Sequence, residues 1–197
     1  MAPKVERRDA LVRAAIDVIA EKGLGGTRVA DIAERAGISP GHVLYYFDGK
    51  AEIFTRALRT VEGDLRREAR EAFEERPSAA DRWDWLVQQA APTGPGDPRV
   101  LLWIQAWERA PRDPDVAQLV VDLDRRWIGL LIEVLEYGVA TGEFAVADVK
   151  EFAIRFSALM DGLMLQVVAG SMAMDREQML EICARAGTEL RRSGAPG

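Results

Sequence analysis

Residues 27–50, TRVADIAERAGISPGHVLYYFDGK, constrain the fold of this 197-residue chain more than any other segment. Apolar side chains recur at helical spacing at Val29, Ile32 and Ala33, which predicts a short helix with one buried face. Gly37 follows at the expected helix end, where a left-handed backbone costs glycine little because it has no Cβ. The segment therefore predicts two short helices joined by a tight turn.

The second of these helices has clear start signals. Ser39 is a good N-cap residue, and Pro40 suits the first helical position because its missing N–H does no harm there. Val43 and Phe47 continue the apolar face, which leaves these residues to face outward: Pro40, Gly41, His42, Tyr45 and Tyr46. A helix-turn-helix presents its second helix to the DNA major groove in this way. The alternative is an ordinary helical hairpin, which also needs an apolar seam and a glycine.

Residues 7–60 resemble the DNA-binding domain of the TetR family of transcriptional repressors. The resemblance rests on these residues: Gly23, Thr27, Val29–Ala30–Asp31–Ile32–Ala33, Ala36–Gly37–Ile38–Ser39, Gly41, Tyr45–Tyr46–Phe47, Lys50 and Ile53–Phe54. It implies an all-α homodimer with a ligand-sensing C-terminal domain. The Leu-Tyr-Tyr-Phe sequence at 44–47 resembles a BetI-like, choline-responsive subgroup. Leu44 stands where many members carry a tyrosine that touches DNA phosphate, and it cannot donate a hydrogen bond.

The DNA contacts expected from this interpretation divide into two roles. Gly41 allows close approach, and His42 or Pro40 contacts base edges, whereas the remaining residues hold phosphates and set the register. Arg28 adds a phosphate or base contact from the preceding helix. The expected DNA-binding set is Thr27, Arg28, Ser39, Pro40, Gly41, His42, Tyr45, Tyr46 and Lys50.

The charge distribution qualifies this interpretation. The chain carries a net charge of −6, but residues 1–50 hold eight Lys and Arg against seven Asp and Glu, so the acidic excess lies further along. DNA binding needs local positive charge facing phosphate rather than a basic protein. We therefore expect modest non-specific affinity and a dependence on dimerisation. The charged N-terminus is no signal peptide, and Cys183, the only cysteine, allows no internal disulfide, so we expect a cytoplasmic protein without a membrane span.

The remaining sequence predicts further helices and no sheet, because no segment alternates strictly at period two. We expect an all-α fold of about nine helices, in which a three-helix head (1–50) precedes a ligand-sensing and dimerisation domain (51–192) and a disordered tail (193–197). Outside the two short helices and the helix that begins at Asp97–Pro98, the expected helices are 5–22, 50 to before Pro77, 78–91, 113–141, 148–170 and 175–192.

The helix expected at 148–170 is apolar on two faces, which predicts burial on two sides. One side meets its own domain, and the other suits the same helix of a second subunit, because a two-fold interface is self-complementary. The TetR resemblance implies a four-helix dimer interface here, with these residues: Phe156, Met160, Leu163, Met164, Val167, Met179, Cys183 and Ala186. The alternative is a monomer in which this helix is simply central. Cys183 suits a small buried apolar residue rather than a reactive thiol.

All five tryptophans lie between residues 83 and 127. Trp103 and Trp107 are four residues apart and share one helix face. Asp161 is an isolated acid on an apolar helix, where a buried charge costs several kcal/mol unless it is paired. Indole faces beside an acid suit a cation, at roughly 0.5–2 kcal/mol per contact. We therefore hypothesise a cationic or amphipathic organic effector bound by Trp103, Trp107, Trp127 and Asp161. One alternative is that the tryptophans fill the core and Asp161 has a structural partner. Another is a pocket in which Glu108 supplies the acid in place of Asp161.

These patterns predict a dimeric DNA-binding regulator, a repressor that leaves a pseudo-palindromic operator when a small organic effector binds. His42 is the only histidine, which argues against a His-based catalytic triad in the body and against a multi-His metal site. We therefore expect no enzyme activity, no metal and no cofactor. Two alternatives remain, a ligand-binding module without specific DNA binding and a helical scaffold with an unliganded core. An activator role is also open.

Overall fold

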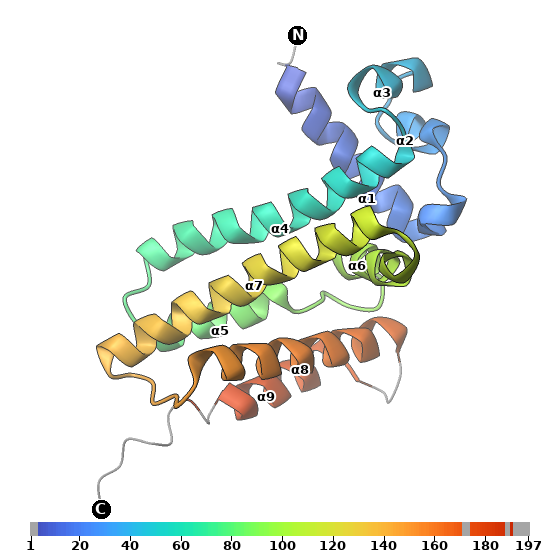
Figure 1. Ribbon diagram of the computed structural model, residues 1–197. Coiled ribbons are helices and arrows are strands. Elements are labelled where there is room, and N and C mark those ends of the chain that lie inside the picture. Colours follow the sequence, from blue (N-terminus) through green and yellow to red (C-terminus); the bar gives the residue numbers. More distant parts are fainter. Residues whose placement is uncertain (1–3, 171–173, 188–189, 191–197) are drawn as a thin grey trace, which may run out of the picture. The chain divides into compact units, whose positions relative to one another are not determined.

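The computed structural model describes residues 4–170, 174–187 and 190. Over these residues the chain forms helices and one 3-10 turn but no strand, which confirms the all-α prediction (Figure 1). The helices are α1 (Lys4–Gly26), α2 (Val29–Arg35), α3 (Pro40–Tyr46), α4 (Lys50–Glu74), α5 (Ala79–Ala90), α6 (Pro98–Arg109), α7 (Pro114–Thr141), α8 (Val149–Ala169) and α9 (Arg176–Gly187), and the 3-10 turn is η1 (Ala110–Arg112). The end expected for the last helix and the expected disordered tail lie outside the described residues.

The chain divides into two compact units. Unit 1 comprises Met1–Gly63 and Gly96–Asp122, and unit 2 comprises Asp64–Pro95 and Leu123–Gly197. Within unit 1, α6 packs on α1 although the two helices are far apart in sequence. The backbone amide of Leu24 donates to Gln105 Oε1 at 3.0 Å and so ties the end of α1 to α6. The division into a DNA-binding and a ligand-sensing domain stays a prediction.

Capping side chains set the helix starts where the sequence predicts them. Asp97 accepts a hydrogen bond from the Arg99 amide at 2.9 Å, and Asp148 accepts one from the Glu151 amide at 2.9 Å. These bonds satisfy N–H groups that lack a partner in the first helical turn. At the other end of α8, Gly170 adopts φ 62°, the left-handed conformation that glycine favours. Capping therefore explains the bounds of α6 and α8.

Each unit has a core of its own. In unit 1, side chains from α1 to α4 are fully buried, among them Ile19, Ile32, Val43 and Phe54. In unit 2, α5, α7, α8 and α9 contribute one cluster around Trp83, whose ring lies 4.5 Å from that of Phe156 between centroids. The core of unit 1 thereby fixes α3, and the core of unit 2 fixes one face of α8.

The α4–α5 junction in unit 2 is held by polar contacts. Glu143, in the loop before α8, accepts hydrogen bonds from the Ala79 amide at 2.9 Å, the Ala80 amide at 3.2 Å and the Ser78 hydroxyl at 2.9 Å. The Ala79 amide is the largest cause, and these bonds together lower the pKa of Glu143 to about 2. An ionised carboxylate at a helix N-terminus also interacts favourably with the helix dipole. Glu143 therefore caps α5 from a distant part of the chain.

Candidate functional site

The first candidate site is the outer face of α3 in unit 1. Gly37 adopts φ 67° in the turn after α2, and the Ile38 amide then donates to the Ala33 carbonyl at 3.0 Å. Val43 is completely buried and α3 packs on α2, so the inner face of α3 is fixed. The opposite face points away from the core. The predicted turn and the predicted inner face are both confirmed.

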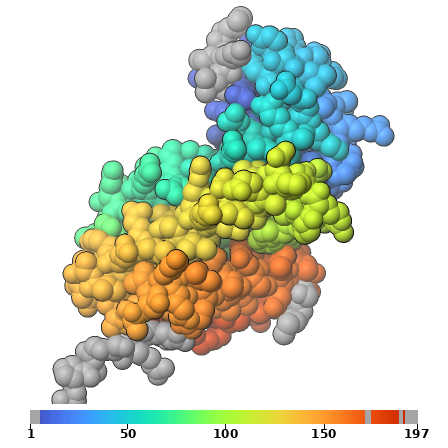
Figure 2. Space-filling view, viewed as in Figure 1, coloured from blue at the N-terminus to red at the C-terminus, as the bar shows by residue number. Residues whose placement is uncertain are grey.

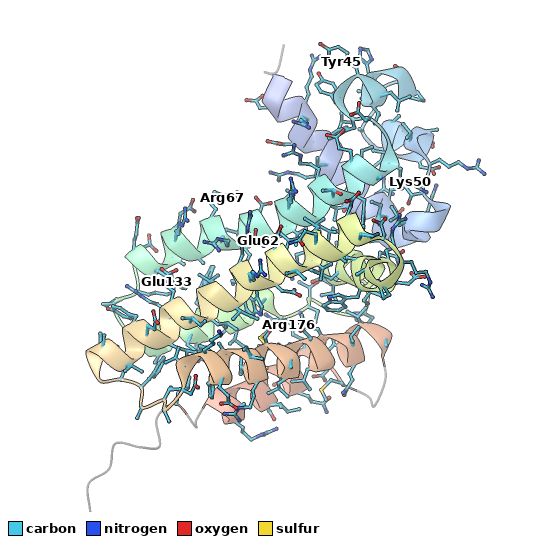
Figure 3. All side chains as sticks on the ribbon, in the orientation of Figure 1. Tyr45, Lys50, Glu62, Arg67, Glu133 and Arg176 are labelled. Atoms are coloured by element: carbon cyan, nitrogen blue, oxygen red, sulfur yellow. The ribbon has the colours of Figure 1, made fainter. Side chains whose placement is uncertain are left out.

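Most of the outward side chains of α3 are exposed as predicted. Pro40, Gly41 and His42 are exposed, and the Tyr45 side chain is 68% exposed at the surface (Figure 3). Tyr46 is half-buried, and its ring meets that of Tyr45 edge to face with centroids 5.2 Å apart. The two phenols therefore form one aromatic edge at the C-terminal end of α3.

Ser39 stands at the N-cap position of α3 but does not cap it. Its backbone is extended, with φ −79° and ψ 151°, yet its side chain makes no hydrogen bond to a backbone amide of α3. Its hydroxyl lies 3.2 Å from Nδ1 of His42 instead. The expected N-cap position is confirmed, but the hydroxyl contacts the His42 ring and not a backbone amide of α3.

Thr27 and Lys50 take places that differ from the expected phosphate contacts. Thr27 is only 2% exposed, and its hydroxyl donates to the Gly23 carbonyl at 2.7 Å, so it faces the interior of unit 1. The Lys50 ammonium donates to the Leu24 carbonyl at 2.7 Å and joins the start of α4 to α1. For Thr27 the correction is physical: burial removes the hydroxyl from any surface that DNA reaches. Lys50 remains half-buried, with part of its side chain at the surface.

A network anchors the end of α3. Arg8 on α1 pairs with Glu52 on α4 at 3.1 Å, and the other oxygen of Glu52 accepts from the Asp48 amide at 2.7 Å. The Arg8 guanidinium also lies over the Phe47 ring, 5.2 Å from its centroid. Sequence reasoning missed this network, because the partners are far apart in the chain. It orients the exposed tyrosines by fixing the backbone that follows them.

Several basic side chains of α1 and α2 are already paired with acids. Lys22 contacts Asp31 at 2.8 Å, and Arg35 contacts Glu21 at 2.6 Å. Arg28 is exposed, and its backbone amide donates to the Asp31 carboxylate at 2.7 Å. Internal pairing lowers the positive potential available to phosphates. These ion pairs therefore leave the N-terminal head with less positive charge available for phosphates than its count of Lys and Arg suggests.

The four expected effector residues divide between the two units. In unit 1, Trp103 and Trp107 are half-buried on α6, with ring centroids 5.9 Å apart. In unit 2, Trp127 on α7 donates its indole N–H to the Ser157 hydroxyl on α8 at 3.1 Å. Asp161 lies one turn beyond Ser157 on the same helix. Trp127 and Asp161 therefore belong to facing parts of α7 and α8.

A second acid accompanies Asp161. Burial, and then the negative charge of Asp124 on α7, raise the pKa of the Asp161 carboxyl to about 6. Burial also raises the pKa of Asp124. Two neighbouring carboxylates in a partly dry site favour a proton or an external cation. Sequence reasoning missed Asp124, although its place three residues before Trp127 puts both on one side of α7.

A groove of about 630 Å³ lies elsewhere in unit 2, between α5 and α9. Its lining includes Trp83, Val87, Glu177 and Leu180, and Arg176 bridges it by donating to the Gln88 carbonyl at 2.9 Å (Figure 3). None of the four expected effector residues lines this groove. The groove and the expected effector site are therefore different places.

The expected dimer residues mostly face the core of their own chain, which corrects that assignment. Phe156, Met160, Leu163, Val167, Met179 and Cys183 are each no more than 6% exposed, while Met164 and Ala186 are half-buried. Burial raises the pKa of the Cys183 thiol to about 11, which suits an inert core residue. Residues of both expected apolar stripes of α8 are buried within the chain, Phe156 on one and Met160 on the other, because helical periodicity alone does not distinguish a core face from a subunit interface.

A different apolar stripe of α8 reaches the surface. Ile154 is 47% exposed, Leu165 is 39% exposed, and the small residues Ala158 and Gly162 between them are exposed. The surface of α8 is visible as the orange band in Figure 2. By length and composition alone α8 is also apolar enough to cross a membrane, which is weak evidence because core helices pass the same test. The stripe is apolar surface of α8 that the described residues of the chain leave exposed.

Comparison with known proteins gives matches over both parts of the chain. Residues 79–191 match the family model for the C-terminal part of BetI-type transcriptional repressors. Residues 11–57 match the model for bacterial regulatory proteins of the tetR family. Together the two matched segments include α2, α3 and all the helices from α5 to α9.

Individual relatives agree with these models. The HTH-type transcriptional regulator BetI of Rhizobium meliloti is 30% identical over 169 residues, which span 81% of this chain and 77% of the relative. BetI of Burkholderia thailandensis is 29% identical, over 89% of each chain. A solved regulator from Saccharomonospora viridis, in complex with choline, is 27% identical with a TM-score of 0.85 and covers 94% of this chain and 97% of its own.

Proposed function

We propose a repressor mechanism for this chain, which belongs to the BetI-type branch of the TetR family of transcriptional regulators. A homodimer binds a pseudo-palindromic DNA operator through α3 of each subunit and leaves it when a small organic effector binds. The observation that carries the proposal is the outer face of α3. Its opposite face is completely buried at Val43, whereas Tyr45 is 68% exposed.

On DNA, each α3 enters a major groove, and the two helices lie about 34 Å apart or a multiple of that distance. Gly41 permits close approach because it has no side chain. A Cβ at this position would meet nothing within 4 Å, so packing within the fold does not by itself require a glycine there. His42 and Pro40 then face base edges from the N-terminal end of α3. Tyr45 and Tyr46 hold phosphates, with Arg28 contributing from the start of α2. Lys50 contributes only through the part of its side chain that is exposed.

The exposed stripe of α8 is the proposed dimer surface. Ile154, Ala158 and Leu165 lie on one side of the helix, and the small residues between the larger ones allow two helices to approach closely. A two-fold axis would bring this stripe against its own copy. Because apolar surface is removed from water in the process, the contact is favourable at roughly 25 cal/mol per Å². Dimerisation then sets the spacing of the two α3 helices.

The effector that we propose is an organic cation held by Trp127, Asp161 and Asp124 in unit 2. Two neighbouring carboxylates in a partly buried place favour a bound cation, and an indole face beside them adds cation–π attraction. The choline complex of the Saccharomonospora viridis relative supports this ligand class. A chain of this kind acts on chromosomal DNA, so we place it in the cytoplasm, with no enzyme activity.

The proposal is tested by in-vitro selection of random DNA duplexes with purified protein at ~150 mM salt, where mostly specific contacts survive screening. We expect a two-fold symmetric sequence. His42→Ala should relax preference at one base position per half-site, whereas Tyr46→Phe should weaken all sequences alike. If no sequence is enriched with or without choline, the chain is a ligand-binding module without specific DNA binding, and the repressor proposal fails.

Effector release is a separate measurement. With the selected duplex, choline should lower the fraction of DNA bound, and the same choline should raise the melting temperature of the free protein by mass action. Asp161→Asn should weaken both responses while DNA binding without choline is retained. DNA release that is equally sensitive to choline in Asp161→Asn would contradict the assigned effector site.

A further inference from the structure

The contact between Ser39 and His42 gives Ser39 a role beyond starting a helix. Both side chains are exposed on the surface that α3 turns outward, and Ser39 Oγ lies 3.2 Å from His42 Nδ1. The backbone supports the same arrangement, because the His42 amide donates to the Ser39 carbonyl at 3.0 Å. The backbone bond holds the two residues at this spacing, and the side-chain contact favours one orientation of the imidazole.

The Ser39 hydroxyl is committed to the ring rather than to the helix. A serine at an N-cap ordinarily accepts from a backbone amide two or three residues on. In α3 that bond is not made, and the hydroxyl lies 3.2 Å from Nδ1 of His42, a distance at which either the hydroxyl or the ring nitrogen can be the donor. A neutral imidazole carries its one hydrogen on the nitrogen that does not accept. When the hydroxyl donates to Nδ1, the hydrogen therefore lies on Nε2.

We propose that Ser39 is a positioning residue for sequence recognition, which orients the His42 ring so that its Nε2–H donates to an acceptor on a base edge. This inference rests on the proposed DNA-binding function. In the major groove, guanine offers the acceptors O6 and N7 side by side, whereas cytosine offers only a donor at this edge. Adenine and thymine each offer a single acceptor there, so the expected preference at the His42 position of each half-site is a G·C pair, with the guanine on either strand.

The experiment separates positioning from capping by its choice of variants. Ser39→Gly keeps a residue that is well tolerated at an N-cap but removes the hydroxyl. Ser39→Thr keeps a hydroxyl. Selection and competition binding are run with the wild type, both Ser39 variants, His42→Ala and the Ser39→Gly/His42→Ala double variant, and the melting temperature of each is recorded.

In the wild type we expect guanine at one position per half-site, preferred by about fivefold, the lower end of what a good base contact gives. Ser39→Gly should lose most of this preference with little change in melting temperature, and Ser39→Thr should retain it. In the His42→Ala background, Ser39→Gly should change base preference no further, because the two residues act as a unit. Replacing the selected guanine by 7-deazaguanine, which lacks N7, should weaken the wild type more than Ser39→Gly.

Other outcomes overturn the inference in distinguishable ways. A wild type that selects a sequence, together with a Ser39→Gly variant that keeps the same base preference, would show that Ser39 does not position His42. A selected base pair at this position that contains no guanine on either strand would refute the guanine contact proposed for Nε2. If the wild type enriches no sequence at all, the proposed DNA-binding function fails, and the role of Ser39 in recognition fails with it.

Discussion

Replacing Gly138 by alanine should destabilise the protein, although the same substitution usually strengthens a helix by about 0.5–1 kcal/mol. Gly138 lies on α7 beneath the ring of Phe144, which is 5% exposed. An added Cβ would lie 2.6 Å from both Cγ and Cε2 of that ring and closer still to Cδ2. Because carbon atoms pack best at about 3.5–4.0 Å, the ring must move by roughly 1 Å.

The ring is not free to make this movement. The Phe144 amide donates to the Gly138 carbonyl at 3.0 Å, which fixes its backbone against the same residue. Overpacking of this kind costs about 1–3 kcal/mol, and three simultaneous clashes place Gly138→Ala in the upper half of that range. After the helix gain is subtracted, we expect a net loss of about 1–2 kcal/mol. For a chain of this size that lowers the melting temperature by roughly 2–8 °C.

A second glycine on the same helix supplies the control. At Gly129 an added Cβ would meet nothing within 4 Å, so Gly129→Ala should raise the melting temperature by roughly 1–4 °C. Thermal unfolding by circular dichroism, at one protein concentration, compares the two variants with the wild type. Adding Phe144→Leu to Gly138→Ala should recover part of the loss, because the two sites share one space. An increase in melting temperature for Gly138→Ala would refute the packing argument.

Four further expectations concern charge and assembly. Asp161→Asn should raise the melting temperature above pH 6 but not near pH 4, because a carboxyl whose pKa is raised to about 6 destabilises the fold only once it ionises; parallel pH profiles would contradict this. Glu143→Gln should lower the melting temperature at neutral pH, and the difference should vanish as the pH falls from 4.5 to about 2, where the wild-type carboxylate is protonated too. Leu165→Glu should shift the dimer towards monomer in sedimentation, and Val139→Glu, an equally exposed site on α7, should not; the reverse would move the interface to α7. Arg28→Gln should reduce the salt dependence of DNA binding by a slope of about 2 for the dimer, and an unchanged slope would remove Arg28 from the phosphate contacts.

Local signals in the sequence predicted the helices well, because capping depends on residues close together in the chain. Asp97 and Asp148 cap α6 and α8 by accepting from amides two or three residues on, so the sequence alone is sufficient to locate them. The inner face of α3 is similarly local, since the turn at Gly37 and the buried Val43 belong to one segment.

The site residues depended on contacts that the sequence does not contain. Thr27 is a plausible surface residue by type, but its hydroxyl bonds to the Gly23 carbonyl inside unit 1. On α8, two apolar stripes are equally suitable for burial, and packing against Trp83 turned Phe156 inward. The proximity of Asp124 on α7 to Asp161 on α8 depends on how the two helices are arranged, which the sequence does not show. Such pairings arise from tertiary structure, which helical periodicity in one segment does not specify.

Leu24 is held from both sides by different helices. Its amide is bound by Gln105 of α6, and its carbonyl is bound by Lys50 of α4. A sliding movement of either helix along α1 must therefore stretch a hydrogen bond at this one residue, and a stretched bond leaves a backbone group without a partner. The hydrogen bonds of Leu24 therefore depend on the positions of two helices: displacement of α6 breaks the bond to its amide, and displacement of α4 breaks the bond to its carbonyl. Amide exchange at Leu24 would report whether the bond to Gln105 of α6 is kept.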